Sequence, residues 1–185
     1  MQLRQIASAA RTGIARAVDG VTRFAKLERV IAAVCLLIPA FLIWFDNGHI
    51  RDSISAYYNM TEAEIFYFPL TVASMLFVVN GVVKERHPYN SLLGVMLAGV
   101  ILFNLDDAKT LHYVFATAFF GGNAVVILVY SSKKERWFKA LLVAGIVLSM
   151  LACFVFNWFT LFWAEWVSFA LIALHYILES WGVID

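Results

Sequence analysis

Long apolar segments recur along this chain and constrain its fold more than any other feature. Short polar stretches separate six of them, at 27–45, 65–83, 91–105, 110–131, 137–157 and 160–181. About 20 apolar residues are enough for a helix to cross the ~30 Å hydrocarbon core of a bilayer. Backbone groups in lipid must be satisfied internally, which favours helices over open strands. The segments predict an all-α polytopic membrane protein with six transmembrane helices, the third of them short.

The composition also favours a bilayer over water. The 185 residues are 62% hydrophobic, whereas a soluble domain is usually about 45–50% apolar. A domain of this size keeps much of its surface exposed and cannot hide such an excess in a core. The net charge of +1 gives no indication of nucleic-acid binding. Cys35 and Cys153 both lie inside apolar segments, where they are expected to be small core residues.

Positive charges are distributed unevenly between the two sides of the predicted bundle. One side carries the stretches before the first segment and after the second, fourth and sixth. That side holds twelve of the fourteen Lys and Arg residues, and the other holds only Arg51 and Lys109. Positively charged loops stay in the cytoplasm. We therefore expect both termini to lie in the cytoplasm, and the location we predict is a bacterial inner membrane.

Residues 1–26 show a different pattern. Apolar residues recur there at three- and four-residue steps, with arginines on the flanks. This pattern is typical of an amphipathic helix that lies on the cytoplasmic membrane surface. Two alternatives are a cleaved organellar presequence and a helix that docks onto a partner.

The loop from about Asp46 to Glu64 contains the polar stretch HIRDSISAYYNM and faces outward in this topology. It is too long for a tight turn. We expect it to fold back over the space between the fourth and sixth helices, as a roof. The candidate ligand-binding residues in it are Asp52, Ser53, Ser55 and Tyr57. The alternative is a solvated loop anchored at the membrane interface.

Two ionisable residues lie at similar depth beneath that loop. His112 is near the start of the fourth segment, and Glu165 lies five residues into the sixth. Such residues usually face the bundle interior and pair. We expect a His112–Glu165 pair with Asp106 or Asp107 above it, all four being candidate ligand-binding residues. The alternative is that the pair only joins two helices.

The sixth segment continues this polar line toward the cytoplasmic side. Glu165, Ser168, His175 and Glu179 fall on one stripe of a helix. His175 and Glu179 are four residues apart and could satisfy each other as a secondary polar pair.

Three motifs are similar to a family of small, mostly bacterial multi-span proteins of unknown function. They are SISAYY at Ser53–Tyr58, LHYVFATAFF at Leu111–Phe120 and LFWAEW at Leu161–Trp166. The similarity covers nearly all of the chain after about residue 28, and a more distant resemblance is to DRAM/Frag-like membrane proteins. The resemblance implies that Ser53, Ser55, Tyr57, His112 and Glu165 are signature positions, and it implies no activity.

Three functions compete on these residues. The first is a non-enzymatic protein whose outward-facing polar pocket binds a lipid, a small amphipathic ligand or a partner subunit. The second is a zinc-dependent intramembrane hydrolase of lipid amides or esters, with His112, Glu165 and Asp106 or Asp107 as metal ligands and catalytic candidates, assisted by Ser53 or Ser55. The third is a proton-linked conduit, since polar groups reach from His112 to His175. The expected partners are membrane lipids and a second copy or another membrane subunit, with no nucleic acid.

Overall fold

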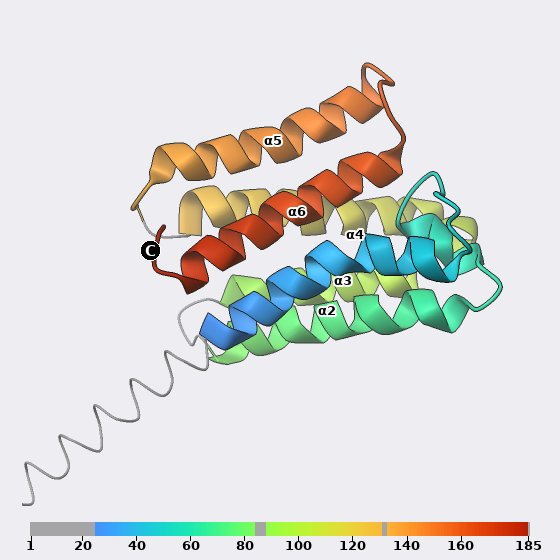
Figure 1. Cartoon of the computed structure of the whole chain (residues 1–185), viewed down its shortest axis with the longest axis horizontal. Helices are drawn as coiled ribbons and strands as arrows, with labels where there is room; N and C mark the ends of the chain where they lie inside the picture. The colour runs from blue at the N-terminus through green and yellow to red at the C-terminus, as the bar shows by residue number, and fades with distance from the viewer. Residues whose placement is uncertain (1–24, 84–87, 131–132, 185) are drawn as a thin grey trace, which may run out of the picture.

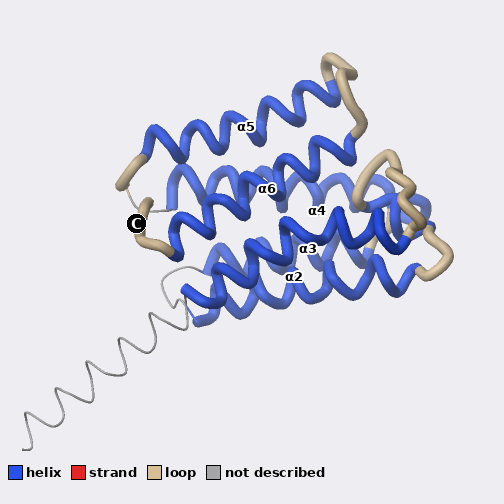
Figure 2. Tube along the Cα trace, in the orientation of Figure 1, coloured by secondary structure: helices blue, strands red, loops and turns tan. Residues whose placement is uncertain are grey.

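The computed structural model describes residues 25–83, 88–130 and 133–184, and the fold there consists of helices alone (Figures 1 and 2). This confirms the predicted all-α class. The predicted amphipathic helix at 1–26 lies almost entirely outside the described residues. The elements in chain order are a first helix Ala25–Phe45, a 3-10 turn η1 (Ser55–Asn59), α2 (Ala63–Val83), α3 (Pro88–Leu102), α4 (Leu105–Val125), a π-helical turn η2 (Val126–Tyr130), α5 (Arg136–Phe154) and α6 (Leu161–Ser180).

Five of these helices are long and apolar enough to cross a membrane, counting described residues only. They are Ala25–Phe45, α2, α4 with its continuation to Tyr130, α5 and α6. The remaining helix, α3, is also apolar but has only 15 residues. Each helix overlaps one of the six segments that hydropathy predicts, and α3 matches the segment expected to be short.

The helices lie lengthwise beside one another, so that their connections gather at two ends (Figure 1). The loop 46–62 and the α5–α6 connection, 155–160, lie at one end, on the right in Figure 1. We call this the loop end. The chain's C-terminal residues lie at the opposite end, which we call the far end. The backbone N–H of Phe162 donates to the carbonyl of Asp52 at 2.8 Å, which ties the start of α6 to the 46–62 loop.

Small residues let α2 and α3 approach closely. A Cβ atom built on Gly94 would lie 2.6 Å from the Ser74 carbonyl oxygen, and one built on Gly81 would overlap the backbone of Ser91. The Ser74 hydroxyl donates to the Gly94 carbonyl at 2.8 Å, and the Ser91 hydroxyl donates to the Val78 carbonyl at 3.0 Å. Glycine and serine are the residues expected where apolar helices pack without a large hydrophobic driving force.

Aromatic side chains fill the centre between α2, α4 and α6. The ring of Phe119 lies 5.5 Å from that of Phe77 and 5.8 Å from that of Phe169, measured between centroids. Phe77 also meets Tyr176 edge-on at 5.7 Å. All four side chains are buried. Edge-to-face packing of this kind stabilises a core beyond the area it buries.

The outer surface of the bundle is also apolar. Leu37, Phe68, Met75, Leu148 and Phe154 are each more than 60% exposed. Monomeric soluble proteins rarely expose contiguous apolar patches larger than a few hundred Å². The fold therefore has one apolar core and a second apolar surface that faces outward.

Candidate functional site

A cavity of about 330 Å³ lies between α4, α5 and α6, in the half of the bundle nearer the loop end. Its walls are mostly apolar, with Phe120 on α4 and Ile146 and Met150 on α5 among the lining residues. His112 and Glu165 also line it. The two residues that the sequence placed at similar depth on different helices are therefore brought to the same cavity.

His112 is 3% exposed and is held by the α3–α4 turn. Its Nδ1 lies 2.8 Å from the carbonyl oxygen of Phe103, a residue just past the end of α3. A carbonyl can only accept, so Nδ1 is the nitrogen that carries the proton. The last carbonyls of a helix have no partner within it, and His112 satisfies this one.

Glu165 is 6% exposed and is held by the 46–62 loop, which we call the roof loop. Its Oε2 accepts a hydrogen bond of 2.6 Å from the backbone N–H of Ile54, which precedes η1. The expected His112–Glu165 pair is not formed among the described residues. Instead, each side chain makes a hydrogen bond to a backbone group, the carbonyl of Phe103 or the N–H of Ile54. The turns at the loop end leave these two groups without partners inside a helix.

The 46–62 loop does fold over this end of α6, but through its backbone. Asp52 contributes its carbonyl to the N–H of Phe162, while its side chain is exposed. The buried hydroxyls of Ser53 and Ser55 lie 3.0 Å apart, and Ser53 Oγ also accepts the N–H of Ala56. Neither serine lines the cavity of about 330 Å³. Both therefore shape the loop rather than face that space.

Tyr57 anchors the loop from inside. It is fully buried, its ring lies 6.0 Å from that of Phe162, and its hydroxyl donates to the His49 carbonyl at 2.7 Å. Burial raises the pKa of the Tyr57 phenol, so the hydroxyl stays protonated and able to donate. The SISAYY motif is therefore part of a loop that packs against α6.

An ion pair that the sequence did not single out holds the base of the loop. Arg51 donates from Nε to Asp46 Oδ2 at 2.6 Å and from Nη2 to Asp46 Oδ1 at 3.1 Å. The hydrogen bond from Arg51 lowers the pKa of the Asp46 carboxyl. The guanidinium also lies 5.6 Å from the centroid of the Tyr57 ring. Bidentate geometry of this kind fixes both side chains.

Asp106 and Asp107 form the first turn of α4 and are exposed. Their backbone N–H groups donate to the side chain of the N-cap residue Asn104, and the helix is interrupted at Ala108, where φ is −144° and ψ is 50°. Neither aspartate lines the cavity. Acidic residues in a first turn are favourable because they face the positive end of the helix dipole.

The residues present do not fit a zinc site. In the described part of the chain, no three His, Cys, Asp or Glu side chains gather in a group that could hold a metal ion. A catalytic zinc needs three protein ligands and an open position. The set of His112, Glu165 and Asp106 or Asp107 expected for a hydrolase is therefore not assembled.

The remaining polar residues of α6 form separate groups. The predicted His175–Glu179 pair is present near the far end, with 3.7 Å between His175 Nδ1 and Glu179 Oε2. Closer to the loop end, the Ser168 hydroxyl donates to the Ala164 carbonyl at 2.8 Å. Between these groups lies Ile172, which is fully buried. Apolar packing therefore separates the polar groups of α6.

A buried amide pair between α2 and α3 was not among the candidate residues. Asn90 Nδ2 donates to Asn80 Oδ1 at 2.5 Å, and the Tyr176 hydroxyl lies 3.4 Å from Asn90 Oδ1. Both asparagines are at most 5% exposed. Asparagine within or beside an apolar segment is the sequence signal for such a contact, since polar side chains commonly join helices in lipid.

A protein-family model described as a family of unknown function, DUF7103, matches residues 37–180. No curated protein and no solved structure matches the chain. The matched range includes the roof loop and the helices α2 to α6, and therefore the whole cavity.

Proposed function

This chain belongs to DUF7103, a family of unknown function, and we propose that it is an inner-membrane protein whose cavity binds a lipid or a small amphipathic molecule. The observation that carries the proposal is the cavity itself. It is apolar over most of its wall and has two buried ionisable residues, His112 and Glu165, on it. Small-molecule sites are typically mostly apolar, with a few convergent polar groups.

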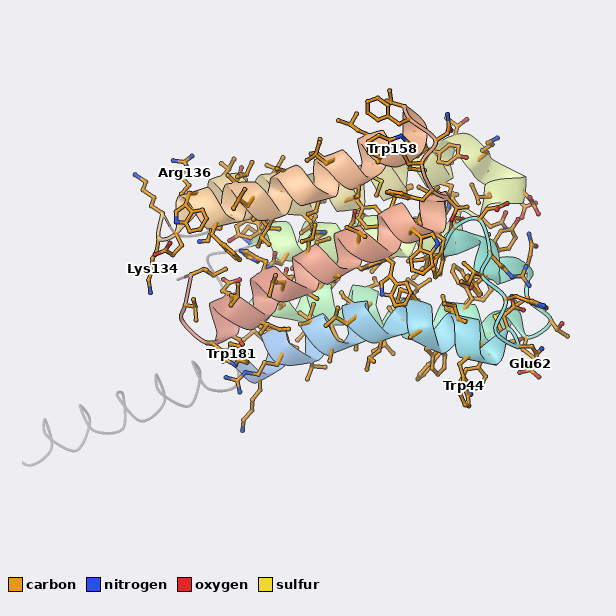
Figure 3. All side chains as sticks on the ribbon, turned by 45° about the horizontal axis from the view of Figure 1, so that its top comes forward. Trp44, Glu62, Lys134, Arg136, Trp158 and Trp181 are labelled. Atoms are coloured by element: carbon orange, nitrogen blue, oxygen red, sulfur yellow. The ribbon has the colours of Figure 1, made fainter. Side chains whose placement is uncertain are left out.

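The proposed membrane location is supported by the exposed surface. Trp44, Trp158 and Trp181 are 81%, 74% and 63% exposed. Figure 3 places Trp44 and Trp158 toward the loop end, and it places Trp181, Lys134 and Arg136 at the far end. Tryptophans at both ends of an apolar belt are typical of the two membrane–water interfaces. In this proposal the far end is cytoplasmic and the loop end faces outward.

A binding role accounts for the arrangement better than catalysis does. The two ionisable side chains are each fixed by one backbone hydrogen bond, from Ile54 and to Phe103, and neither is linked to a nucleophile among the described residues. Nucleophilic catalysis needs a base within hydrogen-bonding reach of the nucleophile. Ser53 and Ser55 are bonded to each other instead.

The experiment uses Gly121, which lines the cavity and has no atom within 4 Å of a Cβ built on it. A Gly121→Leu substitution would place a side chain there without displacing backbone. The matched control is Val114→Leu, because Val114 is exposed on α4 and does not line the cavity. Native mass spectrometry of the purified full chain from phosphatidylcholine nanodiscs would count bound amphipaths. We expect bound molecules in the wild type and the control, and a loss of them in Gly121→Leu. Equal retention in all three proteins would overturn the proposal.

A further inference from the structure

Two polar side chains of the cavity wall, His112 and Glu165, determine which ligand groups can form hydrogen bonds there. We propose that the site selects a single-chain amphipath with an uncharged hydroxyl head, and that it rejects one with an anionic head. This inference rests on the proposed function, because it assumes that the cavity is a binding site. It follows from the two polar side chains that line the cavity and from the absence of a cation among the described lining residues.

In its neutral form, His112 has one hydrogen-bond acceptor left. Its Nδ1 proton is committed to the Phe103 carbonyl, and a neutral imidazole then carries a lone pair on Nε2. Among the described residues, the Phe103 contact is the one hydrogen bond that the ring makes. A ligand group that donates a proton satisfies Nε2, whereas an ether, an ester or a carboxylate has no proton to offer.

Glu165 complements that acceptor. Its Oε2 already takes the N–H of Ile54, and within the described chain no group is hydrogen-bonded to Oε1. If the carboxyl is ionised, Oε1 accepts, and if it is protonated, it can donate. A hydroxyl has one proton and two lone pairs. With a protonated Glu165 it donates to His112 and accepts from Oε1, and with an ionised Glu165 its single proton goes to either His112 Nε2 or Oε1. An ionised carboxylate suits neither arrangement fully.

Charge decides against an anionic head. No Lys or Arg is among the described residues that line the cavity. Placing a charge in a site that does not pair it costs far more than placing a hydrogen-bonded neutral group there. A carboxylate or phosphate head would also face the Glu165 carboxyl, which lies within the same wall.

The size of the cavity suits a single alkyl chain. Its volume of about 330 Å³ is at the low end of the ~300–1,000 Å³ typical of small-molecule sites. The wall that runs from His112 to Ala124 on α4 faces Ile146 to Phe154 on α5. An alkyl chain would lie between these helices with its hydroxyl at the loop end.

The test compares three probes that share a dodecyl chain. Full-length protein in phosphatidylcholine nanodiscs is exposed to 1-dodecanol, dodecyl methyl ether or laurate at equal mole fraction, and native mass spectrometry counts retained molecules. We expect the alcohol to be retained about tenfold more than the ether, the amount that about 1.4 kcal/mol of hydrogen bonding provides. Laurate should be retained no better than the ether.

Two variants locate the selectivity. His112→Phe removes the acceptor and should abolish the preference for the alcohol over the ether while leaving chain binding intact. Glu165→Gln keeps an acceptor for the Ile54 N–H and serves as the second variant if His112→Phe does not fold. It should reduce the same preference, because the amide replaces the carboxyl that faces the cavity.

The outcomes separate the two proposals. Equal retention of all three probes in the wild type, with loss in Gly121→Leu, would overturn the selectivity and keep the binding function. Preference for laurate would do the same. Retention of no probe in the wild type, or equal retention in Gly121→Leu, would overturn the binding function and the selectivity with it.

Discussion

Glu165 links the roof loop to α6 through one buried hydrogen bond, from the Ile54 N–H to Oε2 at 2.6 Å. In Glu165→Ala the Ile54 N–H loses its partner inside the protein, which costs about 1–3 kcal/mol. Glu165→Gln retains an oxygen acceptor and should cost clearly less. Thermal unfolding of the purified variants in the same detergent measures both. Equal destabilisation by Ala and Gln would contradict this role of the hydrogen bond.

Asp46 and Arg51 make the stability of the same loop depend on pH. The pKa of Asp46 is lowered by its hydrogen bond to Arg51, so the pair stabilises the fold above the unfolded pKa, about 3.9. That contribution is lost as the pH falls through the lower, folded value. We expect the difference in melting temperature between the wild type and Asp46→Asn to be constant from pH 7 to 5 and to shrink below about pH 4. A difference that already vanishes near pH 6 would contradict the assignment.

The sequence predicted that His112 and Glu165 lie at similar depth inside the bundle, but it did not identify their partners. Apolar surroundings make an ionisable residue conspicuous, and helical spacing gives its depth. The partners are the Phe103 carbonyl and the Ile54 N–H. Every residue carries these backbone groups, so nothing in the sequence marks the two that the turns leave unpaired.

At the scale of elements, the α2–α3 interface depends on the absence of side chains. A Cβ on Gly94 would lie 2.6 Å from the Ser74 carbonyl oxygen and 2.8 Å from the Val78 nitrogen, both backbone atoms. Gly94→Ala should therefore destabilise the fold by about 1–3 kcal/mol through overpacking. Gly121→Ala, at an open position, should be neutral or stabilising by up to about 1 kcal/mol. Thermal unfolding of both variants after delipidation tests this, and a Gly94→Ala protein as stable as the wild type would refute the close contact.

Hydropathy predicted the helices well because each apolar segment of the sequence corresponds to one helix of similar length. It did not predict the irregularities of α4. The interruption at Ala108 and the π-helical turn Val126–Tyr130 lie at opposite ends of this helix. The hydropathy of the segment is continuous across both irregularities and so gives no signal for either.

At the scale of the whole molecule, the orientation in the membrane is the prediction with the widest consequences. Twelve of fourteen positive residues belong to one side, so the far end should be cytoplasmic. Green fluorescent protein fused after Asp185 should fluoresce, and alkaline phosphatase fused there should be inactive. Active phosphatase at that position would reverse the topology and place the cavity in the cytoplasmic half of the bilayer.

Contacts from distant parts of the chain hold α6 at both of its ends. At its start, Phe162 and Glu165 bind the backbone of the 46–62 loop. Near its end, Arg29 donates to the hydroxyl and carbonyl of Ser180, and Lys134 donates to the carbonyl of Gly182. α6 is therefore held at both ends and forms a fixed wall of the cavity between α4, α5 and α6. We therefore expect admission of a chain to separate α4 from α5, so the packing between these two helices should set the rate of ligand exchange.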